Sequence, residues 1–223
     1  MSNQLHGARA ALYSAAATAF VYPDESVLED LTDPEVVSSL RSAAEALDLA
    51  DAVNGLLEAI DAADPDDLRT TFTSLFAVPE DGAYPVIPYE ANYTTPDEVA
   101  MQQHRIAEVA GLLGSLDLER SDRFDDRQDH VAVELELMQI LAAMRAIAVE
   151  EDAAERGERL AKMEATVLTD HLSDFVPALA HDLRETTDHP VYLAAADLAE
   201  QLVVWDNRHH APVEAPTPGG GPR

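Results

Sequence analysis

The chain has 223 residues, and its 43 acidic residues against 14 basic ones give a formal net charge of −29 at pH 7. This charge excludes nucleic-acid binding through phosphate neutralisation, because the electrostatic contribution would be repulsive. The absence of cysteine excludes disulfides, thiol nucleophiles and thiolate metal sites. Hydrophobic residues make up 47% of the chain in periodic patterns, which excludes the disorder usual for such acidic sequences.

The acidic balance is typical of a halophilic protein. Only one of the basic residues is a lysine, Lys162, and the acids are spread over the whole chain. Self-repulsion is tolerable at about 1 M salt, where the Debye length is about 3 Å. The chain has no uninterrupted apolar stretch of about 18 residues and no secretory signal pattern at its start. We therefore expect a cytoplasmic protein without stable membrane insertion.

Apolar periodicity and capping residues predict an all-α single domain of roughly nine or ten helices. In the first third of the chain, Asp33-Pro34 and Asp64-Pro65 each combine an N-cap with proline at the first helical position. The predicted helices of this part cover 3–21, a short acidic stretch ending at Leu31, and then 34–46, 49–62 and 65–76.

Residues 77–95 lack any helical periodicity and contain several prolines. The segment is longer than most connections within compact domains, and such segments are often functional. It carries Tyr84, Tyr89 and Tyr93, so we expect it to pack against the bundle. Two interpretations remain open: a binding loop, or a proline-stiffened connection whose tyrosines cover the core.

The second half of the chain begins with a helix that starts at 95–98 and ends near Leu113. A polar connection over 114–126 leads to a helix over 127–150, which is apolar around most of its circumference and therefore predicted to be central. Two further helices are expected over 152–169 and 170–184, and a last one over 190–206. We assign 1–207 to the helical domain and 208–223 to a disordered tail rich in proline and glycine.

His130 and Glu134 stand four residues apart at the start of the central helix and so share one face. Three functional interpretations of this pair remain open: an ion pair, a hydrogen-bonded recognition site, or two ligands of a metal. A metal site needs three or four ligands, and His171 could join them only through the tertiary fold, so we expect no metal and no cofactor. In the simplest alternative, Asp129 caps the helix and the pair is a weak, partly exposed one.

Catalytic motifs are missing from the sequence. There is no nucleophile elbow and no glycine-rich phosphate loop, and close acidic pairs are inevitable among so many carboxylates. The motifs alone therefore identify no catalytic residues.

Five segments, in order along the chain, resemble the TorD/DmsD/NarJ family of cytoplasmic chaperones for molybdenum-cofactor oxidoreductases. The segment around Asp129 is the most specific of them. It departs from the family pattern at Gln128, where proline is frequent, and at Leu137, where phenylalanine is common. The matching segments are Arg9–Tyr13 with Phe20–Pro23, Leu68–Phe76, Pro88-Tyr89-Glu90-Ala91-Asn92-Tyr93, Asp129–Met138, and His171-Leu172-Ser173-Asp174-Phe175-Val176-Pro177.

The resemblance implies a helical chaperone that performs no chemistry. Its partner would be the apo catalytic subunit of a molybdopterin-dependent oxidoreductase, often bound at its twin-arginine signal peptide, with export held back until the cofactor is inserted. Such a chaperone would be a monomer or a homodimer. One alternative is a NarJ-like assembly factor for a nitrate-type reductase subunit that is not exported. Another is a metal-dependent or nucleotide-hydrolysing helical enzyme.

A receptor for such a peptide needs carboxylates that pair with arginine and an apolar surface beside them. His130 is the one nearby group expected to change charge near neutral pH, and we expect it to order the loop carrying Glu90 rather than to bind arginine. The predicted client-peptide-binding residues are Tyr89, Glu90, Tyr93, Asp129, His130, Glu134, Glu136, Leu137 and Met138.

Overall fold

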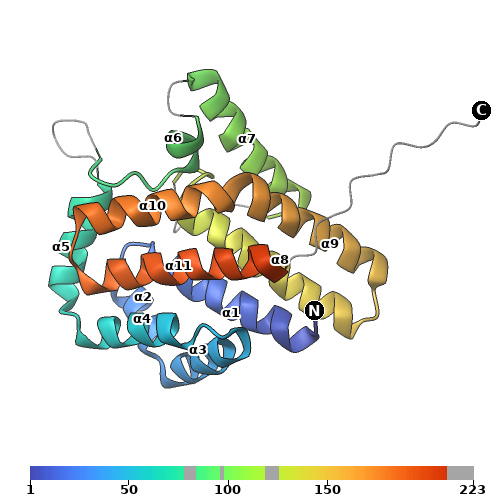
Figure 1. Cartoon of the computed structure of the whole chain (residues 1–223), viewed down its shortest axis with the longest axis horizontal. Coiled ribbons are helices and arrows are strands. Elements are labelled where there is room, and N and C mark those ends of the chain that lie inside the picture. The colour runs from blue at the N-terminus through green and yellow to red at the C-terminus, as the bar shows by residue number, and fades with distance from the viewer. Residues whose placement is uncertain (78–83, 96–97, 119–125, 210–223) are drawn as a thin grey trace, which may run out of the picture.

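The computed structural model describes residues 1–77, 84–95, 98–118 and 126–209, and these form helices and their connections (Figure 1). The predicted all-α fold is therefore confirmed. The elements in chain order are α1 (Asn3–Ala19), α2 (Glu25–Thr32), α3 (Pro34–Leu47), α4 (Ala50–Ala62), α5 (Pro65–Phe76), α6 (Glu90–Thr94), α7 (Val99–Ser115), α8 (Val131–Glu150), α9 (Ala154–Thr166), the π-helix η1 (Val167–Leu172), α10 (Ser173–Thr186) and α11 (Pro190–His209).

The two Asp-Pro signals place helix starts as predicted. Asp33 caps α3 by accepting the backbone N–H of Glu35 at 2.8 Å, and Asp64 caps α5 by accepting that of Asp66 at 2.9 Å. In both helices proline follows the cap, where its missing N–H costs nothing.

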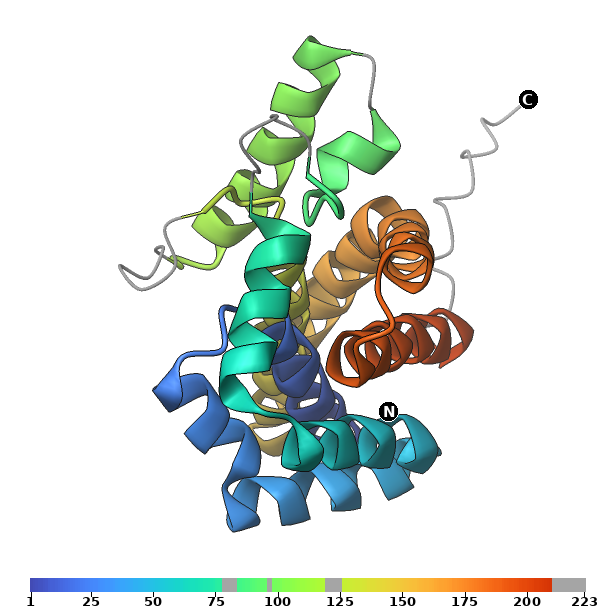
Figure 2. The ribbon, with the colours of Figure 1, turned by 90° about the vertical axis from the view of Figure 1, so that its left-hand side faces the viewer.

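Helix α8 lies in the middle of the bundle, as its apolar pattern predicts. It packs most extensively against α1, and it also contacts α9 and η1. Leu135 and Leu141 of α8 and Leu12 of α1 are completely buried. The remaining helices surround this pair, with α3 and α4 on one side and α10 and α11 on another (Figures 1 and 2).

The predicted break near residue 170 is absent, because α9, η1 and α10 follow one another without a turn. No glycine or proline stands at the junction, so nothing there ends the helix. The chain instead widens into the π-helix Val167–Leu172, a rare form that occurs mostly as single turns and frequently at functional sites.

Helices α6 and α7 stand off one side of the bundle (Figures 1 and 2). The short α6 lies within the segment predicted to be irregular. Val109 is the buried residue of α7, and Val99 at its start is exposed. Within the described part of the chain, no helix combines the length and the apolar character needed to cross a bilayer. The predicted tail from 210 onwards lies outside the described residues.

A buried ionic network joins α1 to α9 and α11. Arg9 donates two hydrogen bonds to Asp206, from Nε at 2.7 Å and from Nη2 at 2.8 Å, and a third to Glu164 at 3.0 Å. Tyr13 also donates to Asp206, and Arg145 of α8 donates to the second oxygen of Glu164. Because each charge in this network is paired, its burial is tolerated.

Candidate functional site

The segment before α6 is tied to the start of α8 by a short antiparallel contact. Tyr89 and His130 form an isolated β-bridge, and the backbone N–H of Glu90 donates to the carbonyl of Asp129 at 2.9 Å. The two motif segments, forty residues apart in sequence, therefore meet as the predicted recognition site requires.

Asp129 is a buried acceptor for a complete guanidinium fork. Arg127 donates from Nε to Oδ1 at 2.9 Å and from Nη2 to Oδ2 at 2.7 Å, and the backbone N–H of Ala91 donates to Oδ2 at 3.1 Å. The guanidinium also lies over the Tyr89 ring, 4.3 Å from its centroid. Asp129 and Tyr89 together make an arginine-binding site, and Arg127 of the same chain fills it.

His130, not Asp129, caps α8. Its Nδ1 accepts the backbone N–H of Ala132 at 3.1 Å, so the neutral ring carries its proton on Nε2. Burial lowers the pKa of His130 from 6.5 to about 4, despite the nearby carboxylates of Asp126 and Asp129. The expectation that His130 changes charge near neutral pH is therefore wrong. Its position beside Tyr89 agrees with an ordering role.

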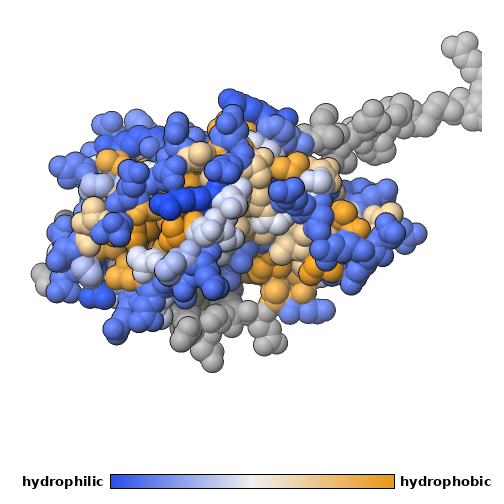
Figure 3. Space-filling model, turned by 90° about the horizontal axis from the view of Figure 1, so that it is seen from below, coloured by the Kyte–Doolittle hydropathy of each residue, from blue (hydrophilic) through white to orange (hydrophobic). Residues whose placement is uncertain are grey.

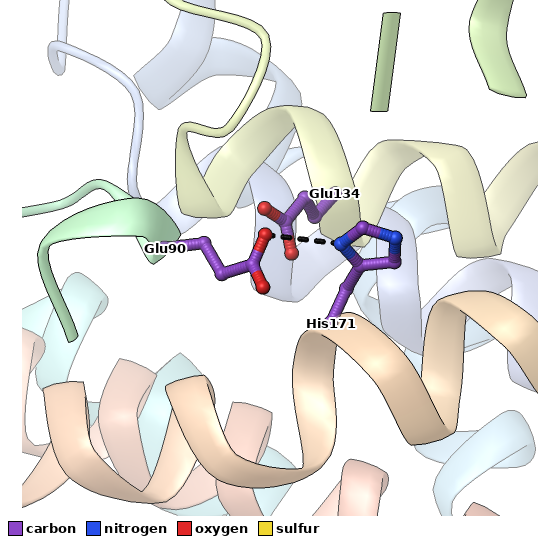
Figure 4. Close-up of side chains that lie close together, drawn as sticks. All are labelled: Glu90, Glu134 and His171. Carbon is purple, nitrogen blue, oxygen red and sulfur yellow. Dashed lines mark hydrogen bonds and ion pairs between the residues drawn. The ribbon is translucent and has the colours of Figure 1, made fainter. Parts of the chain in front are cut away.

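Glu134 lies beside Glu90 and His171 (Figure 4), and both Glu134 and His130 are buried. His171 Nδ1 lies 3.0 Å from Glu90 Oε2, and ligand atoms of the three residues all lie within 4.8 Å of one another. All three side chains are buried. We call Glu90, Glu134 and His171 the buried acid–imidazole cluster. The alternative of a weak, partly exposed His130–Glu134 pair is therefore wrong.

The cluster contains two buried carboxyl groups, and Arg105 forms an ion pair with one of them. Arg105 of α7 places Nε 3.6 Å from Glu90 Oε1, which makes an ion pair but no hydrogen bond. Neither carboxylate oxygen of Glu134 has a hydrogen-bond partner among the described residues. Burial, followed by the charges of Glu90 and Asp129, raises the pKa of Glu134 well above its ordinary value.

The other predicted site residues are divided between the core and the surface. Leu137 and Met138 are buried in the core, while Glu136 is exposed. At 100° per residue, Glu136 lies on nearly the opposite side of α8 from Glu134. Tyr93 is half-buried, and its hydroxyl donates to Asp182 of α10 at 2.9 Å. The structure thus brings together the residues of the 88–93 loop and of 129–134, but not Glu136, Leu137 or Met138.

Two residues of the site were missed from the sequence, Arg105 and Arg127. His171 was considered only as a ligand that the tertiary fold could add, and it was not among the predicted site residues. His171 opens the last of the five motif segments, and this position is the signal that could have placed it in the site. Arg127 stands two residues before Asp129, but charge spacing alone does not predict a fork. Arg105 has no local signal, because only the position of α7 brings it to Glu90.

A hollow of about 520 Å³ lies between α1, α2 and α3, away from this site. It is lined by Ala15 of α1, Leu31 of α2, Leu40 of α3 and their neighbours, and it contains none of the predicted peptide-binding residues. Seen from below, the surface is mostly hydrophilic with apolar patches between the hydrophilic residues (Figure 3).

Residues 42–181 match the family model described as the nitrate reductase delta subunit. The chain belongs to this family. The match includes all three residues of the buried acid–imidazole cluster, and it confirms the NarJ/TorD-type family predicted from the motif segments.

Among solved structures, the chain is similar to a putative redox enzyme maturation protein from Archaeoglobus fulgidus. The TM-score is 0.54 at 18% identity, and the match covers 88% of this chain and 93% of the other. At this identity the likeness shows the fold. No curated protein sequence matches the chain.

Proposed function

We propose that this protein is a cytoplasmic chaperone for the assembly of a molybdopterin-dependent oxidoreductase. In this role it binds the apo catalytic subunit and holds back export until the cofactor is inserted. Membership of the nitrate reductase delta subunit family and the maturation-protein fold support the general assignment. The further proposal, that the contact is with an N-terminal twin-arginine signal peptide, rests on the site.

The observation that carries the peptide proposal is the arginine-binding site of Asp129 and Tyr89. A fork of two hydrogen bonds and a ring beneath the guanidinium are what a client arginine needs. Arg127 supplies that guanidinium in the free protein, with Nε 2.9 Å from Asp129 Oδ1 and Nη2 2.7 Å from Asp129 Oδ2. In our proposal a client arginine takes the place of Arg127. The buried carboxylate of Asp129 therefore keeps a cationic partner when the client binds.

The remaining predicted residues have different roles in this proposal. Tyr93 is half-buried and so is available at the edge of the site. Glu90, His130 and Glu134 are buried and position the 88–93 loop against α8. Leu137 and Met138 support α8 from the core, and Glu136 would meet a client only on the other face of the helix.

Retention of the client by variant chaperones tests this proposal. A tagged chain in native cell extract at molar salt should retain an oxidoreductase subunit, identified by mass spectrometry. Asp129→Ala removes the acceptor and His130→Ala loosens the loop, so both should reduce the retained subunit about tenfold or more. Glu155→Ala, which removes an exposed acid on α9, is the matched control. Retention at the wild-type level by both variants, with helicity unchanged, would reject the site.

A second candidate is an assembly factor for a nitrate-type reductase subunit that is never exported, and the family description favours it. The two candidates differ in the client's N-terminus. A twin-arginine leader on the retained subunit supports the first, and a subunit without one supports the second.

A further inference from the structure

The carboxyl group of Glu134 is buried without a hydrogen-bond partner among the described residues. Its side chain has no exposed surface, and neither oxygen is hydrogen-bonded within the described part of the chain. An isolated buried carboxylate costs several kcal/mol, so a second group must neutralise it. Arg127 is paired with Asp129, and Arg105 is shared between Glu90 and Glu108 and makes no hydrogen bond to Glu134. Either a bound proton or a bound metal cation therefore neutralises the carboxylate of Glu134.

The geometry of the buried acid–imidazole cluster fits a single ion. Its three ligand atoms come from α6, α8 and η1, and they lie within 4.8 Å of one another. Ligand atoms about 2.0–2.2 Å from a tetrahedral zinc ion lie about 3.3–3.6 Å apart. The side chains therefore need to draw together by up to about 1.4 Å to bind it. Figure 4 shows the three side chains pointing toward one another from separate elements.

The donor set indicates the kind of ion. Two carboxylates supply two negative charges, which a divalent ion balances, and an imidazole nitrogen favours a transition metal over magnesium or calcium. Three protein ligands leave a fourth tetrahedral position for water. The rare π-helix that carries His171 is a second feature frequent at functional sites.

We propose that Glu90, Glu134 and His171 bind one divalent transition-metal ion, for which zinc is the best match. The ion would replace the 3.0 Å contact between His171 and Glu90 and join α6 to α8 and η1. It would thereby fix the 88–93 loop onto the bundle. This inference does not depend on the identity of the client.

Zinc binding by the full chain tests the proposal. The protein is treated with EDTA, dialysed into molar potassium chloride, incubated with zinc chloride and passed through a desalting column. Elemental analysis should then find about one zinc per chain, with a higher unfolding temperature than the EDTA-treated protein. Magnesium chloride in place of zinc chloride should leave the unfolding temperature unchanged.

Two glutamates two positions apart on α8 give a matched pair of variants. Glu134→Gln removes a ligand without changing the size of the side chain, and it should abolish both the retained zinc and the temperature shift. Glu136→Gln removes an exposed acid from the same helix and should retain both. His171→Gln provides a second ligand variant, with helicity measured by circular dichroism to establish that it folds.

Three outcomes would overturn the proposal. The first is wild-type protein that retains no zinc, which is the result expected if a proton neutralises Glu134. The second is retention of zinc by folded Glu134→Gln or His171→Gln. The third is equal loss in Glu136→Gln, because zinc would then be held by surface carboxylates in general.

Discussion

Arg127 is the residue whose role in the site differs most from the sequence-based prediction. The sequence predicts that Asp129 awaits a guanidinium from another protein. In the structure Asp129 already accepts one, and the same guanidinium covers the Tyr89 ring. The paired guanidinium offsets part of the hydration that a carboxylate loses on burial. The internal arginine is thus a competitor that any client arginine must displace.

Replacing Arg127 should raise the affinity for a client peptide, whereas replacing Asp129 should lower it. Arg127→Gln should bind a synthetic peptide with paired arginines and an apolar stretch about tenfold more tightly. The peptide then no longer has to break the two charge-assisted hydrogen bonds between Arg127 and Asp129. Binding is measured by fluorescence anisotropy at molar salt.

The control for this measurement is Arg156→Gln, which removes the same charge from a partly exposed position on α9. It should bind the peptide as the wild type does. Equal affinity for Arg127→Gln and Arg156→Gln would show that Arg127 does not compete for the site.

At the scale of the elements, local signals and tertiary contacts explain different parts of the molecule. Asp33-Pro34 and Asp64-Pro65 fix helix starts because cap and proline act within one turn. The pairing of the 88–93 loop with 129–134 also follows from the sequence, through the motif segments. The buried acid–imidazole cluster does not, because His171 reaches Glu134 through the packing of η1 on α8. The spacing of apolar residues likewise does not predict the π-helix η1. A π-helix has about one more residue per turn than an α-helix, and its residues continue the helix without a break.

The network that joins α1 to α9 and α11 predicts a specific pH dependence through His6. Burial, followed by the charges of Arg145 and Arg9, lowers the pKa of His6 from 6.5 to about 4. Between these values the unfolded chain takes up a proton that the folded chain does not. The free energy of unfolding therefore falls as the pH falls from 6.5 to 4, by at most about 1.4 kcal/mol per pH unit for this group.

Replacing His6 should reduce that slope. His6→Gln, studied by urea denaturation at fixed molar salt, should lose less stability than the wild type between pH 6.5 and pH 4. The buried His130 contributes with the same sign and remains in both proteins. His181→Gln, at an exposed position, is the control and should keep the wild-type slope. Identical slopes for all three proteins would exclude the depressed pKa of His6.

For the whole molecule, the net charge of −29 determines the conditions in which the fold persists. Pairs such as Arg9–Asp206 are buried and little affected by salt, whereas most carboxylates repel one another through solvent. We predict loss of helicity as salt is diluted from about 1 M, where the Debye length is about 3 Å, to about 0.01 M, where it is about 30 Å. Circular dichroism at 222 nm measures the helicity. Sucrose in place of salt is the control, because it adds solute without ions. Unchanged helicity at low salt would contradict the prediction.

Helix α7 touches the bundle mainly through α6, and Val109 is its one buried side chain among the described residues. A helix with fewer fully buried side chains gains less cooperativity from the core, so we expect its amides to open to solvent at a lower free energy than those of α8. Arg105 lies on this helix and pairs with Glu90. Each opening of α7 therefore also separates Arg105 from Glu90, which couples the motion of this helix to the buried acid–imidazole cluster.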